Sequence, residues 1–348
     1  MSVSVRPRTI AASAAAAVVL AAAIIFPQVV SSPLLVTMAI FTLIFAIMSS
    51  GWNILGGYTG YISLGHAAFF GIGAYALARL SDHITVSTGY EPFFLLPVVG
   101  LIGAAFAVPL GIVALRTRRH VFVVLTIAML FIGQLLATNL RDVTNGSTGQ
   151  GLPQPPWLGD FFNVPFYYAG LVVLIAAIGV SWWIRRSKFG LSLRAIRDDE
   201  DRALGLGVNA GLAKLVCFVV AAFFIAMAGA IYAYFVTYIY PPVVFDPLAD
   251  LAMVLMAFTG GVGTVWGPVL GAFLIEPAHE YFAFTYGDSG LYLILYGCLF
   301  LVVILLLPQG IIPTIRAMIA SYRARRSPGP TTATVAGVPP SRKETAAR

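Results

Sequence analysis

The sequence predicts an all-α integral membrane protein, a polytopic helical bundle of about ten crossings with discontinuous helices. Of the 348 residues, 59% are hydrophobic and 10% are charged, and the mean hydropathy is +0.90. Soluble domains are roughly 45–50% apolar and about 25% charged. Apolar runs of about 20 residues, enough to span a bilayer, follow one another along the chain. Two glycine-rich segments interrupt these runs, so we expect breaks in the helices.

The first apolar run follows a basic start in "MSVSVRPRTIAASAAAAVVLAAAIIFP". A secretory signal has a similar pattern, but this run is long enough to span and no small-x-small cleavage site follows it. We therefore expect a first span here. Further spans are expected at residues 34–52, 65–81, 92–115, 120–139, 165–184, 212–236, 250–260, 265–285 and 290–307.

The charge pattern predicts how the chain is oriented, because lysines and arginines beside spans stay in the cytoplasm. With a cytoplasmic N-terminus, all 21 lysines and arginines except Arg79 and Arg141 fall inside. We expect a multi-pass protein with both termini cytoplasmic, whose net charge of +7 needs no nucleic acid as a partner. The predicted parts are a membrane domain at 1–312, a periplasmic loop at 140–165, a cytoplasmic loop at 185–211 and a basic, mostly disordered tail at 313–348.

The first glycine-rich segment, "GWNILGGYTGYISLGHAAFFGIGAY", covers residues 51–75. Small residues let helices pack closely in lipid, and a discontinuous helix can expose backbone groups to a polar solute. Both interpretations stay open, because polar side chains are interleaved with the glycines. The candidate residues for a translocation path are Asn53, Gly57, Tyr58, Thr59, Gly60, Ser63 and His66 here and Glu276 further on. A shorter break at 258–273, "FTGGVGTVWGPVLGAF", resembles this segment faintly, as an internal repeat would.

Ionisable residues are rare in the predicted spans, but Glu276, His279 and Glu280 fall within one of them. An ionised carboxylate at mid-bilayer costs about 3 kcal/mol on insertion scales. These groups either form a polar lining or subunit contact, or lie at the outer surface. The four histidines form no pair at metal-ligand spacing, and both cysteines lie in apolar runs, so no metal is predicted.

The cytoplasmic loop contains "SKFGLSLRAIRDDEDRALGLGVN", residues 187–209. Ser192 is a candidate N-cap, and Gly205 and Gly207 are expected to end a short surface helix. Leu193, Ile196 and Leu204 can share its apolar face. Four consecutive acids offset the basic residues, which favours a protein partner over a lipid surface.

The chain lacks the signatures of an enzyme or a nucleotide-binding protein. A Walker A loop needs Gly-Lys-Ser/Thr, whereas Lys188, Lys214 and Lys343 are followed by Phe, Leu and Glu. No nucleophile elbow or zinc-protease motif occurs. We expect a transport subunit without cofactor, with energy supplied by a partner.

Three stretches carry a resemblance to a known family: residues 53–75, residues 189–209 and "GGVGTVWGPVLGA" at 260–272. Together they are similar to the permeases of branched-chain amino-acid ABC importers, of the LivM type. The resemblance covers most of residues 34–312 and implies the ABC importer permease fold. It also implies a bacterial inner-membrane subunit that forms half of a pore.

The resemblance implies the partners as well: a second, LivH-like permease, two cytoplasmic ABC ATPases that bind ATP, and a periplasmic solute-binding protein. The segment from Asn53 to His66 resembles part of the translocation path. The stretch that resembles an ATPase-coupling helix contains Leu193, Arg194, Ile196, Arg197, Asp198, Asp199, Glu200, Arg202 and Gly205.

Two alternatives remain at this point. Asp246, Asp250, Glu276 and His279 depart from the family pattern, and similar permeases carry urea or short-chain amides. An ion-coupled secondary transporter would need a buried ionisable relay, for which Glu276, His279 and Glu280 are the candidates.

Overall fold

The structure is a computed structural model. The structure describes residues 7–30, 32–82, 88–157, 159–287, 290–306 and 310–326. The predicted tail from 327 onward lies outside the described residues, while its first part belongs to a helix. The long helices are α1 (Pro7–Val29), α2 (Pro33–Thr59), α3 (Ala67–Ser81), α5 (Leu96–Ala114), α6 (Arg119–Asn139), α8 (Asn163–Arg186), α9 (Lys188–Asp198), α11 (Ala210–Val236), α13 (Pro247–Gly260), α14 (Gly267–Tyr286), α15 (Leu291–Leu306) and α16 (Ile311–Arg326).

Short elements connect these helices. They are α4 (Glu91–Phe94), α7 (Arg141–Thr144), the 3-10 turns η1 (Gly146–Thr148) and η2 (Gly159–Phe161), α10 (Glu200–Gly205), α12 (Pro241–Val244) and the strands β1 (Gln150–Gly151) and β2 (Tyr238–Ile239). The strands pair antiparallel, with Gln150 opposite Ile239. The strand β1 belongs to the predicted 140–165 loop and β2 follows α11, so this pairing connects the loop to the end of α11.

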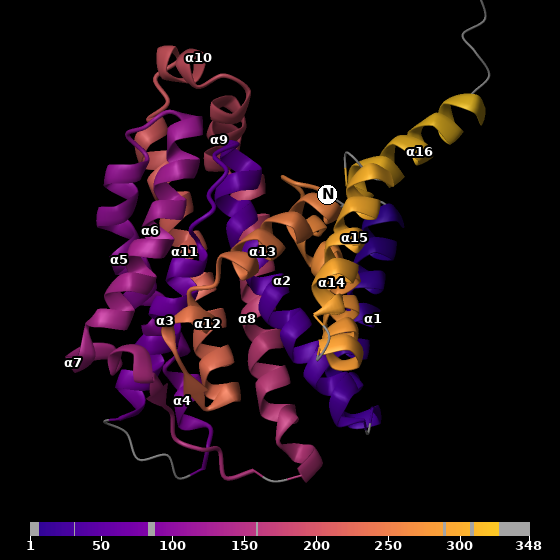
Figure 1. The fold of residues 1–348 in the computed structure, drawn as a ribbon. Helices are drawn as coiled ribbons and strands as arrows, with labels where there is room; N and C mark the ends of the chain where they lie inside the picture. Colours follow the sequence, from indigo (N-terminus) through magenta and orange to yellow (C-terminus); the bar gives the residue numbers. More distant parts are fainter. Residues whose placement is uncertain are drawn as a thin grey trace, which may run out of the picture.

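Within the described residues, 6 segments are long and apolar enough to cross a membrane: α2, α5, α6, α8, α11 and Pro241–Gly260. The helices α1, α3, α14 and α15 belong to the same bundle (Figure 1). The predicted polytopic helical membrane fold is confirmed, and the number of crossings stays approximate.

The helix α11 lies at the centre of the bundle and packs against α2, α3 and α5. Its contact with α3 is a close approach of two backbones, because a Cβ at Gly73 would meet the carbonyl of Ala226 and one at Gly229 would meet the carbonyl of Phe70. In lipid, small residues stabilise helix pairs by allowing such contact. Close packing therefore explains part of the glycine content.

The first predicted break is shorter than the glycine pattern indicates. The helix α2 continues through Gly51, Gly56 and Gly57 to Thr59, and Gly60 caps it in the left-handed region at φ 75°. Buried packing maintains the helix there despite its glycines, since nearly all of its second half is buried. The irregular backbone is confined to residues 60–66, which we call the α2–α3 break.

The bundle has two ends, which the basic residues distinguish. One carries α9 and α10 and is called the α9–α10 end; the α5–α6 turn, with Arg116 to Arg119, lies there too (Figure 1). At the opposite end, Arg79 donates to the carbonyl of Asp142 at 2.8 Å. This separation follows the predicted charge pattern, and which face is cytoplasmic stays a prediction.

Candidate functional site

The helix α9 begins five residues earlier than predicted. Ser187 is its N-cap, extended at φ −77° and ψ 164°, and its hydroxyl accepts from the Gly190 amide at 3.1 Å. The prediction of Ser192 was wrong, because this residue is inside the helix and its hydroxyl donates to the carbonyl of Phe189 at 2.7 Å. The chain turns directly after α8, so the first serine takes the cap. Leu193 and Ile196, predicted to share one face of the helix and to couple to an ATPase, are fully buried within this chain.

The predicted single surface helix is two helices, because Asp199 is extended between α9 and α10. Its carboxylate accepts from the amide of Arg202 at 3.1 Å and pairs with the Arg202 side chain at 2.9 Å. This N-cap starts a new helix in a different direction. Leu204 is therefore 51% exposed and does not share the buried face. Gly205 ends α10, as predicted.

Arg197 connects α9 to α2. Its guanidinium donates to the carbonyl of Gly57 at 2.7 Å and lies against Gly263 in the loop after α13. Charge-assisted hydrogen bonds of this kind are roughly twice as strong as neutral ones. This hydrogen bond connects the last turn of α9 to the end of α2.

The same end of α2 holds the loop 261–266. The Asn53 side-chain amide donates to the Thr264 carbonyl at 2.9 Å and its oxygen accepts from the Gly263 amide at 2.8 Å. Both hydrogen-bonding functions of this buried side chain are thus used. The loop joins α13 to α14, so Arg197, Gly57 and Asn53 link three parts of the bundle.

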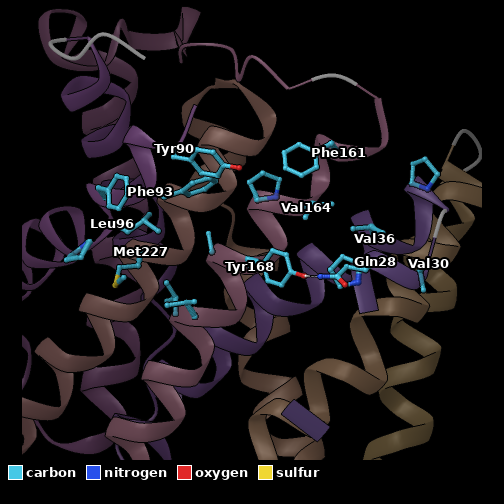
Figure 2. Close-up of a pocket in the computed structure, with 18 of the residues that line it drawn as sticks. Gln28, Val30, Val36, Tyr90, Phe93, Leu96, Phe161, Val164, Tyr168 and Met227 are labelled. Carbon is cyan, nitrogen blue, oxygen red and sulfur yellow. Dashed lines mark hydrogen bonds between the residues drawn. The ribbon is translucent and has the colours of Figure 1, made fainter. Parts of the chain in front are cut away.

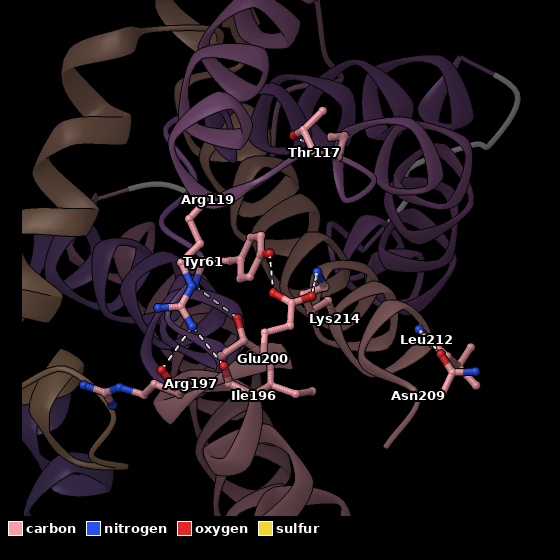
Figure 3. Close-up of polar contacts among 11 residues, drawn as sticks. Tyr61, Thr117, Arg119, Ile196, Arg197, Glu200, Asn209, Leu212 and Lys214 are labelled. Atoms are coloured by element: carbon pink, nitrogen blue, oxygen red, sulfur yellow. Dashed lines mark hydrogen bonds and ion pairs between the residues drawn. The ribbon is translucent and has the colours of Figure 1, made fainter. Parts of the chain in front are cut away.

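Arg119, at the start of α6, holds the last turn of α9. Its guanidinium donates to the carbonyls of Ile196 at 2.9 Å and Arg197 at 3.1 Å (Figure 3). These carbonyls are at the helix C-terminus, where a cation is favourable.

A second connection joins α10 to α11 and to the α2–α3 break. Glu200 pairs with Lys214 of α11 at 2.6 Å and accepts from the Tyr61 hydroxyl at 2.5 Å (Figure 3). The Lys214 side chain is only 4% exposed, and its ammonium lies 4.1 Å from the centroid of the Tyr61 ring. A buried ammonium needs such partners, because an unpaired one is costly. We call Tyr61, Glu200 and Lys214 the anchor cluster.

The charge of Glu200 depends on this cluster. Burial by itself raises the pKa of the carboxyl, but the hydrogen bonds from Lys214 and Tyr61 and the charges of Lys214 and Arg119 lower it further than burial raises it. The net pKa therefore lies below its ordinary value. Glu200 is ionised at neutral pH and holds α10 on the bundle.

The α2–α3 break is irregular backbone enclosed by protein. The amide of Leu64 donates to the hydroxyl of Thr126 in α6 at 3.0 Å. Asp250 of α13 accepts from the amide of Ala67 at 2.7 Å and so stabilises the first turn of α3. Such backbone is tolerated at membrane depth only where other parts of the protein satisfy it.

The predicted path residues are all in or next to this region except one. Tyr58 hydrogen-bonds Ser181 of α8 through its hydroxyl at 2.6 Å, and Thr59 donates to the Leu55 carbonyl at 2.8 Å. Ser63 and His66 are buried, and their side-chain polar atoms have no hydrogen-bond partner among the described residues. Glu276 lies on α14 and pairs with His279. That these residues line a path stays a prediction, since in this conformation they are buried within one chain.

Two cavities accompany these features. One of about 590 Å³ opens at the α9–α10 end between residues 115–120 and 198–201, so bases line one side and acids the other. The second, of about 940 Å³, is mostly apolar and lies between α1, α5 and α8 (Figure 2). There the hydroxyl of Tyr168 accepts from Gln28 at 3.2 Å and donates to the Ile24 carbonyl at 2.8 Å.

Sequence reasoning missed Arg119, Lys214 and Tyr61 as members of the site. In the sequence, Arg119 and Lys214 were counted only among the basic residues that indicate how the chain is oriented. Tyr61 was only one polar residue of the glycine-rich segment. A lysine four residues into an apolar 27-residue helix was an available signal, because a buried ammonium needs a carboxylate. Which carboxylate it pairs with depends on the fold.

The architecture defines a multi-pass α-helical membrane protein whose surface helices are bonded to its spans. The family model of the branched-chain amino acid transport system / permease component matches residues 34–304. The chain belongs to this family, as the resemblance implied.

Among curated proteins, the chain is similar to the high-affinity branched-chain amino acid transport system permease proteins LivM and LivH. LivM of Salmonella typhimurium is 27% identical over 309 residues, which cover 81% of this chain and 70% of LivM. LivM of Escherichia coli is 26% identical over the same length and coverage. LivH of Salmonella typhimurium is 24% identical over 291 residues, 77% of this chain and 91% of LivH. No solved structure matches the chain significantly.

Proposed function

We propose that the chain is the LivM-like permease subunit of an ATP-driven importer of branched-chain amino acids. It forms half of the translocation pore in a bacterial inner membrane, with both termini in the cytoplasm. The family match and the LivM relatives support this proposal. The positively charged α9–α10 end supports the orientation, because bases beside spans stay inside.

The other components follow from the same proposal. The second half of the pore is a LivH-like permease, and the similarity of this chain to both LivM and LivH supports pairing of two related subunits. Two cytoplasmic ABC ATPases bind the ATP, so the permease itself needs no cofactor. A periplasmic solute-binding protein delivers the amino acid.

The observation that carries the mechanism is the double attachment of α9 and α10. Leu193 and Ile196 anchor α9, Arg197 bonds α2, and Glu200 bonds α11 and the α2–α3 break. The residues left exposed for an ATPase groove include the charged Arg194, Asp198, Asp201 and Arg202 and the apolar Leu191, Leu204 and Leu206. ATPase closure displaces this helix pair, and the displacement reaches α2, α11 and loop 261–266 through these bonds. The pore then alternates between outward and inward opening.

One experiment tests the function as a whole. The complete complex is reconstituted in vesicles with ATP inside, and uptake of leucine, urea and acetamide is measured with and without ATP and binding protein. Leucine uptake that requires both supports the proposal. Uptake driven by a proton gradient without ATP would favour the secondary transporter, for which Glu276, His279 and Glu280 are the candidate relay. Uptake of urea or acetamide alone would correct the substrate.

A further inference from the structure

Three potential metal ligands meet on one face of α14. Glu276, His279 and Glu280 occupy positions i, i+3 and i+4 of the helix, which places their side chains side by side. One ligand atom from each lies within 4.8 Å of the others. The imidazole Nδ1 of His279 is 3.4 Å from Oε1 of Glu276. We call these three residues the α14 cluster.

The cluster is partly buried and incompletely satisfied: Glu276 is buried, whereas His279 and Glu280 are partly exposed. The side chain of Glu276 is 0% exposed, and its Oε2 has no hydrogen-bond partner among the described residues. Tyr296 of α15 packs its ring 4.4 Å from the imidazole, centroid to centroid, and its hydroxyl is also buried without a partner there. Buried polar groups in a folded protein are normally paired, so these atoms indicate a missing partner.

The charges show what kind of partner is missing. Two carboxylates lie together in an apolar helix, and the ion pairs of the described residues offer them only the imidazole of His279. Like charges this close in a medium of low dielectric cannot both stay ionised without a cation. One divalent ion balances both carboxylates and leaves the cluster neutral.

We propose that the α14 cluster binds one divalent transition-metal ion of the zinc class. Zinc binds carboxylate oxygen and imidazole nitrogen at about 2.0–2.2 Å, so two ligands of one ion lie about 3–4 Å apart. The ligand atoms of the cluster now lie within 4.8 Å of one another, so they must move closer together to hold an ion. The imidazole favours zinc over magnesium or calcium, which take oxygen ligands. Glu-x-x-His is also the ligand pair that metal-binding helical bundles use.

The proposal is independent of the transport function, because it rests on the geometry of α14 and its contact with α15. The effect of the ion is local. It links side chains of one turn of α14 and neutralises their charge beside Tyr296 of α15. Binding therefore stabilises the α14–α15 pair, and zinc raises the Tm of the protein.

The test uses the full-length chain, free of affinity tag, after exposure to zinc and removal of unbound ion. Metal content is measured by mass spectrometry, and cobalt replaces zinc to give an absorption spectrum of the bound ion. Two variants remove ligands with little change of shape, Glu276→Gln and His279→Asn. The matched control is His120→Asn, which removes an exposed histidine at the start of α6. Gel filtration and the Tm without metal show that each variant is folded.

We expect one zinc ion per chain, a cobalt spectrum and a higher Tm with zinc in the wild type and in His120→Asn. Both ligand variants lose all three. Absence of retained zinc in the wild type would overturn the proposal in favour of carboxyl groups that are protonated. Equal zinc retention by all four proteins would also overturn it, because the ion would then be adventitious only.

Discussion

The guanidinium of Arg197 in α9 and the carbonyl of Gly57 in α2 are 2.7 Å apart, although the two residues are 140 positions apart in the chain. This hydrogen bond connects the surface helix α9 directly to the membrane-spanning helix α2. Gly57 is also beside Gly263, so the contact reaches the loop between α13 and α14. The connection depends on one side chain and can therefore be tested by one substitution.

The ion pair between Glu200 and Lys214 is expected to contribute to stability. Glu200→Gln keeps the shape but leaves the ammonium of Lys214 without its counter-charge, at a cost of about 1–3 kcal/mol. The Tm of the purified chain should fall by a few degrees, and the exposed control Asp201→Asn should leave it unchanged. The double variant Glu200→Gln, Lys214→Met removes the unpaired ammonium and should be more stable than Glu200→Gln alone. Equal stability of the two would show that the unpaired ammonium is not the cause of the lower Tm.

The same carboxyl predicts a pH dependence. Burial raises the pKa of the Glu200 carboxyl, but hydrogen bonds and nearby positive charges lower it below its ordinary value in the folded protein. A group with a depressed pKa contributes stability that is present above the unfolded pKa and is lost as pH falls through the folded pKa. The Tm difference between wild type and Glu200→Gln should be complete at neutral pH and should close below about pH 4. A constant difference over that range would contradict the assignment.

Asp250 is expected to hold the first turn of α3. Its carboxylate is buried and accepts from the amide of Ala67. Asp250→Asn retains an acceptor and should be tolerated, whereas Asp250→Leu leaves the amide unpaired at a cost of about 1–3 kcal/mol. Thermal unfolding measures both variants. A leucine variant as stable as the asparagine variant would show that water satisfies the amide.

The approach of α3 to α11 should not tolerate a methyl group. Gly73→Ala forces the side chain into the carbonyl of Ala226, and overpacking of this kind costs about 1–3 kcal/mol. Gly179→Ala is the matched control, because this helical glycine in α8 has nothing within 4 Å of an added Cβ. Yield and Tm should fall for the first variant alone. If Gly73→Ala and Gly179→Ala had the same yield and Tm, then α3 and α11 would be able to move apart without loss of stability.

Much of the fold could be predicted from the sequence, because apolar runs of spanning length are a direct consequence of the bilayer. The predictions were less accurate where packing competes with local preference. The helix α2 passes through Gly51, Gly56 and Gly57 because neighbouring helices compensate for their low helix propensity. The break at Asp199 had a signal, since aspartate is a good N-cap, but the four consecutive acids gave it no unique position.

The site was predicted in part. Leu193 and Ile196 follow helical periodicity and share a face of α9 as expected, but this face is buried within the chain itself and is not open to a partner. The hydrogen bond between Asp250 and Ala67 joins residues 183 positions apart, and no local pattern encodes that distance. The sequence shows Glu276, His279 and Glu280 within one predicted span. The spacing of the histidines alone does not indicate a metal site there, because two of the three potential ligands are carboxylates at helical spacing.

The central claim is that α9 drives α2 through Arg197, and it is tested most directly by the leucine imported per ATP hydrolysed in vesicles. Wild type, Arg197→Gln and the control Arg116→Gln, which changes an exposed base of the α5–α6 turn, are compared after all three are shown to assemble with the proposed ATPases. Loss of a charge-assisted hydrogen bond should lower this ratio for Arg197→Gln by about tenfold and leave Arg116→Gln at the wild-type value. The same ratio in all three proteins would contradict the account.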